Sequence, residues 1–240
     1  NHDCKVFLAK DIEAKMLKRL LNDGLPEETI QWTPIPVLPT YKRVLRGAPY
    51  WQKALAPSRL DAVHWPYYPL PNVEIPTVLT VHDTRFIHYP QTYKPLRRQF
   101  LRFTVPLSLK RATRIVTVSN HTKTDLVEYY NVNPDKIKVV YNVISPAFNR
   151  QYSEQRLHKI RQTYSLPEKY ILYVGTLEPR KNLNRLIEAF AYLKNENKIS
   201  GKLVILGQKH FNYHSIWQFV RENNLEDAIL FTGYVADEDL

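Results

Sequence analysis

Residues 170–193 read YILYVGTLEPRKNLNRLIEAFAYL and predict a buried strand, a short loop and an amphipathic helix. The β-forming run 170–174 ends at Gly175. Asn182 is the expected N-cap, and the apolar residues after it recur at helical spacing: Leu183, Leu186, Ile187, Phe190 and Leu193. The loop therefore lies at the carboxyl end of a strand, which is where open α/β sheets bind their ligands.

The loop carries two adjacent cations, Arg180 and Lys181, directly before the predicted helix. A helix N-terminus contributes about half a positive charge, and arginine can bind a phosphate through two parallel hydrogen bonds. An adjacent pair of cations is usually only solvated. In this strand–loop–helix context, a solvated surface and a phosphate site are about equally supported.

The rest of the chain continues the alternation of strands and helices. We expect residues 31–59 to form a long loop with at most one short helix, and Pro106 to interrupt a helix over residues 93–112. The other predicted strands cover residues 5–9, 62–65, 77–81, 114–118, 136–140, 203–206 and 229–231, and the other predicted helices cover residues 12–22, 121–130, 154–164 and 215–222. This order predicts an α/β protein with parallel sheets, divided into domains at 1–148 and 149–240.

Composition narrows the possible classes of protein. With 44% hydrophobic residues, the chain of 240 residues can bury a core and is not of the disordered class. The single cysteine, Cys4, excludes a disulfide framework and a cysteine-rich zinc site. His210 and His214 have a ligand-like spacing but suggest no third ligand, so no metal site is predicted. The net charge of +11 suits anionic partners.

Several segments together resemble the group 1 (family 4) glycosyltransferases. The matching segments are VLTVHDTRFIHYP (78–90), RIVTVSNHTKTDL (114–126), KIKVVYNVISPAF (136–148), the 170–193 stretch, LVILGQK (203–209) and ILFTGYVADEDL (229–240). The resemblance implies the GT-B fold, in which two Rossmann-like domains face each other across a cleft. It also implies retaining transfer of a sugar from a nucleotide-sugar donor, with no cofactor and no obligatory metal.

The resemblance also assigns residues to the donor. Lys181 matches the lysine that holds the donor diphosphate, and Arg180 beside it is expected to share that role. Thr176 stands where many relatives have the arginine of a G-R-L motif. Tyr234 and Val235 match the turn that borders the nucleotide base.

Two further positions belong to the acceptor-side domain. His82 matches the histidine at the cleft floor near the transferred sugar, although a His–Asp pair after a strand is more often structural. Asp83 is expected either to orient His82 or to cap the following turn. Asn142 matches the asparagine of the N-G-[IV]-D motif, in which Val143 here replaces the glycine.

The family also carries a glutamate pair, E-x7-E, downstream of residue 240, and a first strand with a glycine-rich loop at the start of the acceptor domain. Neither is found in the chain. We therefore expect a longer protein that lacks both ends here, with the second domain incomplete.

Residues 94–114 combine basic and apolar side chains. A basic amphipathic helix can lie on an anionic lipid surface, which would suit a lipid-linked acceptor. An ordinary helix packed on the sheet, with solvated arginines outside, is equally supported. The expected location is the cytoplasm, with peripheral attachment to the inner face of the plasma membrane under the lipid interpretation.

The leading hypothesis is a glycosyltransferase that uses a nucleotide-sugar, with a mannosyl-type donor favoured, and a polysaccharide or lipid-linked acceptor. One alternative is a noncatalytic nucleotide- or sugar-binding module. The other is a basic nucleic-acid-binding protein, but the tyrosines are scattered and no RNA-binding motif is visible. No nucleic-acid partner is therefore predicted.

Overall fold

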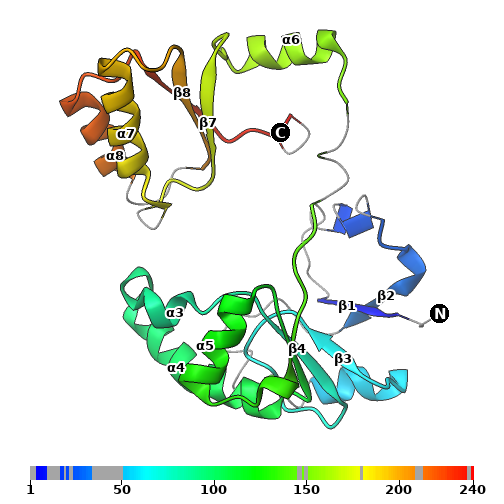
Figure 1. Cartoon of the computed structure of the whole chain (residues 1–240). Helices are drawn as coiled ribbons and strands as arrows, with labels where there is room; N and C mark the ends of the chain where they lie inside the picture. Colours follow the sequence, from blue (N-terminus) through cyan, green and yellow to red (C-terminus); the bar gives the residue numbers. More distant parts are fainter. Residues whose placement is uncertain are drawn as a thin grey trace. The chain divides into compact units, whose positions relative to one another are not determined.

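The structure is a computed structural model that describes residues 4–9, 17–18, 20–21, 24–33, 51–144, 148, 151–178, 181–208, 213–236 and 239–240. The chain divides into two compact units, Asn1–Val143 and Ile144–Leu240. Each unit has its own parallel sheet and its own hydrophobic core (Figure 1).

The first unit contains a four-stranded parallel sheet in the order β3–β4–β5–β6. Its strands are β3 (Val63–Trp65), β4 (Thr77–Val81), β5 (Arg114–Thr117) and β6 (Ile137–Val139). Its helices are α3 (Arg85–His88), α4 (Pro95–Arg111) and α5 (Asn120–Tyr130), with short 3-10 turns at Glu27–Thr29, Ala56–Ser58, Pro90–Thr92 and Pro134–Lys136. Helix α4 packs on β4, and α5 packs on β5 and β6.

Helix α4 corrects one expectation, because it runs unbroken through Pro106. Proline has no N–H to donate to the carbonyl of Arg102, one turn earlier. Both residues are exposed, so water can satisfy that carbonyl. The opposite side of the helix buries Leu101, Val105 and Leu109 in the core, which holds the helix together across the proline.

A second correction concerns the first part of residues 31–59, which we expected to form a loop; residues 34–50 lie outside the described residues. Residues 30–33 form strand β2 (Ile30–Thr33), which pairs in parallel with β1 (Val6–Ala9) in a separate two-stranded sheet. The Thr33 hydroxyl donates to the Leu8 carbonyl oxygen at 2.9 Å. Residues 51–55 are helical, in line with the short helix allowed for this segment.

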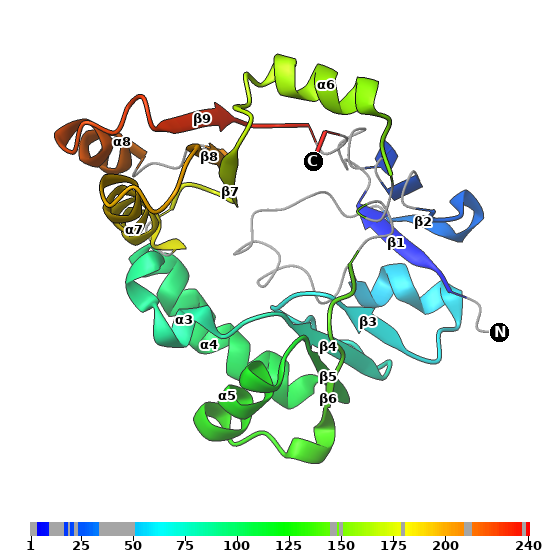
Figure 2. The ribbon, with the colours of Figure 1, turned by 45° about the horizontal axis from the view of Figure 1, so that its top comes forward.

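The second unit contains three parallel strands, β7 (Tyr170–Val174), β8 (Lys202–Leu206) and β9 (Ile229–Gly233). Helices α7 (Leu183–Asn195) and α8 (Tyr213–Glu222) lie side by side over one face (Figure 2). Leu203 and Ile205 point into the core on that face. Val204 and Leu206 instead line a cavity of about 200 Å³ with side chains of α6 (Glu154–Thr163) on the other face.

The prediction of an α/β protein with parallel sheets is thus confirmed, because every strand pair described is parallel. Within the same described ranges, no helix is long and apolar enough to cross a bilayer. Most of the predicted 12–22 helix lies outside the described residues.

Candidate active site

The carboxyl edge of the second sheet is built from glycines. Gly175, Gly207 and Gly233 lie at the ends of the three strands, and the Gly175 and Gly207 N–H groups each donate at 2.9 Å, to Leu206 and Gly233. A Cβ added at Gly207 would lie 1.8 Å from the Gly175 carbonyl oxygen. Only glycine allows this approach, so the strand ends pack backbone against backbone where ligands bind in such sheets.

The loop after β7 leads from this edge to the start of α7. The side chain of Lys181 is exposed, and its backbone N–H donates to the Glu178 carbonyl at 3.0 Å. Asn182 is the N-cap as predicted, but it has a left-handed backbone (φ 53°) and its side chain makes no capping hydrogen bond. The first N–H groups of α7 are therefore left without a side-chain acceptor from the cap, beside a lysine. Arg180 lies outside the described residues.

Thr176 is the residue that the family resemblance sets opposite the arginine of a G-R-L motif. Its Oγ1 donates to Glu178 Oε1 at 3.3 Å, and its carbonyl accepts from the Tyr173 hydroxyl at 3.3 Å. Glu178 is a loop residue that the sequence reasoning missed, although it stands two positions before Arg180. The Thr176 hydroxyl is turned toward this carboxylate, and because it is neutral it cannot supply the positive charge of an arginine.

Tyr234 and Val235 have different surroundings. The Tyr234 side chain is exposed, whereas Val235 is buried and lines the cavity under α6. Of the two predicted base contacts, only Tyr234 presents its side chain to solvent.

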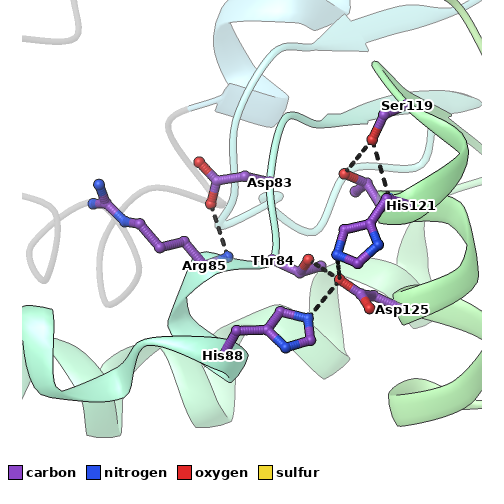
Figure 3. Close-up of polar contacts among 8 residues, drawn as sticks. Asp83, Thr84, Arg85, His88, Ser119, His121 and Asp125 are labelled. Atoms are coloured by element: carbon purple, nitrogen blue, oxygen red, sulfur yellow. Dashed lines mark hydrogen bonds and ion pairs between the residues drawn. The ribbon is translucent and has the colours of Figure 1, made fainter. Parts of the chain in front are cut away.

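In the first unit, His82 directly follows β4 and so lies at the carboxyl edge of its sheet. Leu79 and Val81 are fully buried, and the exposed His82 follows them directly. The Tyr67 ring lies against the His82 ring, with centroids 5.0 Å apart at 37°. Asp83 Oδ1 accepts the Arg85 N–H at 3.1 Å (Figure 3). Of the two roles considered for Asp83, the structure thus shows capping of the following turn.

Next to this pair lies a buried carboxylate that the sequence reasoning missed. Asp125 Oδ2 accepts a short hydrogen bond from the Thr84 hydroxyl and a second at 2.9 Å from His88 Nε2 (Figure 3). His121 Nε2 lies 3.7 Å from the same oxygen. Burial works to raise the pKa of the Asp125 carboxyl, but the bonds from Thr84 and His88, with the charges of His88 and His121, lower it overall. The contact joins α3 to α5, so no local sequence pattern signals it.

Comparison with known proteins follows the same division of the chain. Residues 4–148 match the family described as Glycosyltransferase Family 4. The chain belongs to glycosyltransferase family 4. Residues 156–240 of this family 4 protein match Glycosyl transferases group 1, so the predicted family is confirmed.

Two bacterial relatives are mannosyltransferases. The O-antigen chain mannosyltransferase B of Escherichia coli is 30% identical over 74% of this chain and 46% of its own length. The O-antigen chain mannosyltransferase RfbU of Salmonella typhimurium is 28% identical over 68% of this chain and 41% of its own length. The family 4 chain therefore spans less than half the length of these curated relatives.

A solved structure shares the fold. Anabaena HepE in complex with UDP and glucose aligns with a TM-score of 0.65 at 18% identity, covering 96% of this chain and 62% of HepE. At this identity the likeness speaks for the fold alone, and it confirms the GT-B fold class. The structure gathers Thr176, Lys181 and Asn182 around one strand end, and His82 and Asp83 around another. Their roles in the family 4 protein remain predictions.

Proposed function

We propose that this protein is a retaining glycosyltransferase that moves a sugar from a nucleotide-sugar donor to a polysaccharide or lipid-linked acceptor. One observation carries the proposal: Lys181 stands at the start of α7, whose cap offers no side-chain acceptor. The loop that holds it begins at a strand edge where glycine backbones meet. The first main-chain N–H groups of α7, to which this loop leads, are donors that a diphosphate could accept from.

The proposed chemistry needs a stabilised leaving group. As the glycosidic bond to the donor breaks, negative charge grows on the nucleoside diphosphate. Lys181, Arg180 and the N-terminal end of α7 would stabilise that charge, and preorganised groups of this kind are typically worth about 3 kcal/mol each in rate. Since these groups neutralise the diphosphate, the proposed transfer uses no cofactor and no catalytic metal.

Two features support the choice of donor sugar and the role of His82. The named relatives are mannosyltransferases of O-antigen chains, which favours a mannosyl-type donor and assembly of a surface polysaccharide. His82 is exposed at a strand end of the other unit, which suits contact with the transferred sugar. We place the protein in the cytoplasm, where nucleotide-sugars are made, with peripheral contact to the inner face of the membrane.

A thermal-shift screen tests the proposal directly. The intact protein is heated with UDP, GDP, ADP and their sugar conjugates, GDP-mannose included. We expect one base to raise the melting temperature selectively, and Lys181→Ala to reduce that shift. Transfer of labelled sugar is then measured with the donor that binds. The absence of a shift with every nucleotide contradicts the proposal, and a shift without transfer favours the noncatalytic binding module.

The outward side of α4 supports docking on an anionic lipid surface. Leu96 is 87% exposed and Phe103 is 71% exposed, and Leu107 is also exposed. Positions i, i+7 and i+11 lie along one strip of a helix. Lys110 and Arg111 are exposed at the end of the same helix. An apolar strip beside cations is the combination that binds a membrane surface, so we propose that α4 brings the protein to a lipid-linked acceptor.

Flotation with vesicles containing anionic lipid checks this docking surface. We expect the intact protein to float at low salt and the double variant Leu96→Ser/Phe103→Ser to lose at least tenfold in binding, because each exposed apolar side chain is worth more than about 1.4 kcal/mol when buried. Tyr192→Ser, on exposed surface of α7, is the matched control and should float normally. Equal flotation of the double variant and the control would rule out α4 as the docking surface.

A further inference from the structure

We propose that His88, His121 and Asp125 form a binding site for one divalent transition-metal ion, with Zn²⁺ as the preferred ion. The site lies in the first unit, where the last residue of α3 meets the first turn of α5 and the turn that follows (Figure 3). His121 and Asp125 stand four residues apart on α5, so both side chains project from one face of the helix.

The distances suit a tetrahedral ion. Zn–N and Zn–O bonds of about 2.0–2.1 Å place neighbouring ligand atoms of a tetrahedron about 3.3 Å apart. Asp125 Oδ2 lies 2.9 Å from His88 Nε2 and 3.7 Å from His121 Nε2, on either side of that value. All three ligand atoms lie within 4.8 Å of one another. Small side-chain rotations therefore suffice to close the set around an ion.

The donor set selects the kind of metal. Two imidazole nitrogens and one carboxylate suit Zn²⁺ and its transition-metal neighbours, whereas Ca²⁺ and Mg²⁺ prefer a shell of oxygens. The Asp125 side chain is only 4% exposed and supplies a buried negative charge that a cation would offset. A metal ion can reach the site from solvent, because the His121 side chain is 77% exposed and that of His88 is 31% exposed.

The surroundings resemble the support that metal ligands usually have. The Thr84 hydroxyl donates to Asp125 Oδ2 and so holds the carboxylate in position. The Tyr129 ring packs edge-on against His88, with centroids 5.7 Å apart at 89°. A structural His88–Asp125 hydrogen bond explains one histidine. The His121 ring, 5.6 Å from the His88 ring at 32°, brings a second imidazole to the same carboxylate oxygen.

A metal ion bound at this site would hold α3 and α5 in position and would take no part in glycosyl transfer. An ion held by His88 and Asp125 fastens α3 to α5, and the segment between His82 and His88 is short. Holding His88 in place would therefore also hold the segment 82–88, and with it the end of β4 where His82 lies. Metal binding itself does not depend on the proposed glycosyl transfer, so a failure of one leaves the other standing.

Titration of the metal-free protein with Zn²⁺, and with Co²⁺ followed by its visible absorption, tests the site. We expect one ion to bind per protein molecule at this site. The visible absorption of bound Co²⁺ should be that of an ion with a low coordination number. His121→Ala, an exposed position that the fold tolerates, should abolish binding at this site, and His88→Ala should do the same. Thr84→Val should weaken binding about 10- to 100-fold, as loss of an outer-shell partner does.

His158→Ala is the matched control, because His158 is an exposed histidine on α6 of the other unit. It should bind as the parent protein does, and circular dichroism should show that every variant is folded. Undiminished stoichiometry and affinity in folded His121→Ala would overturn the proposal, as would the absence of Zn²⁺ and Co²⁺ binding by the parent protein.

Discussion

Replacing Lys181 by alanine in the intact protein is expected to lower turnover about a hundredfold. The lysine is exposed directly before α7, in a loop that begins at the carboxyl edge of β7. Charge that develops on a departing diphosphate would meet both its ammonium group and the helix N-terminus. Loss of one preorganised partner of this kind typically costs about 3 kcal/mol in the transition state. The measurement is kcat for transfer from the donor that the thermal-shift screen identifies.

Lys198→Ala is the matched control for this experiment. It removes the same charge just past the opposite end of α7, where Lys198 pairs with Glu196 at 3.8 Å, and it should leave turnover unchanged. Lys181→Arg should recover part of the activity, because it keeps the charge but alters the geometry. Full activity of Lys181→Ala would remove this lysine from the mechanism.

Replacing His82 by alanine is expected to lower kcat/KM about a hundredfold, which is the low end for loss of a positioned polar group in a transition state. The imidazole is exposed at the end of β4, and the Tyr67 ring lies against it at a tilt of 37°. A ring so placed is free to bind a sugar hydroxyl or to stabilise charge on the anomeric centre. Steady-state kinetics with saturating donor and varied acceptor would measure the loss.

Tyr67→Phe separates a direct role of His82 from a packing role. The substitution keeps the ring beside His82 and removes only the hydroxyl, so activity should change little. His82→Asn keeps hydrogen-bonding capacity and should lie between the parent and His82→Ala. If His82→Ala melts early and loses activity only in proportion to unfolded protein, the histidine serves the fold and not the reaction.

The elements that the sequence predicted well are those with a strong local pattern. Strands β4 and β7 have the predicted bounds, because β-branched and aromatic runs are closed there by His82 and Gly175. The burial predicted for residues 170–174 is wrong: β7 is an edge strand, on which Ile171, Leu172 and Val174 are exposed. Helix α5 begins one residue earlier than predicted, after Ser119, whose Oγ accepts the Thr122 N–H at 3.1 Å. Such caps can be predicted from the sequence, because the two residues that form them are only three positions apart.

The elements that were missed depend on contacts between distant segments. Strand β2 is four residues long and is held by β1, so its own pattern was too short to identify it. The continuity of α4 through Pro106 rests on core packing of the side opposite the proline. His121 is exposed, and its relation to His88 exists only once α3 and α5 meet.

The glycine edge of the second sheet limits how this protein can be re-engineered. Because a Cβ at position 207 would collide with the Gly175 backbone, mutant libraries aimed at another donor sugar should leave that position untouched. Variation is better directed to Thr176 and Tyr234, whose exposed side chains lie on the same strand ends. Under the proposed function, changes in donor choice would therefore come from these loop residues, because no side chain can be added at position 207.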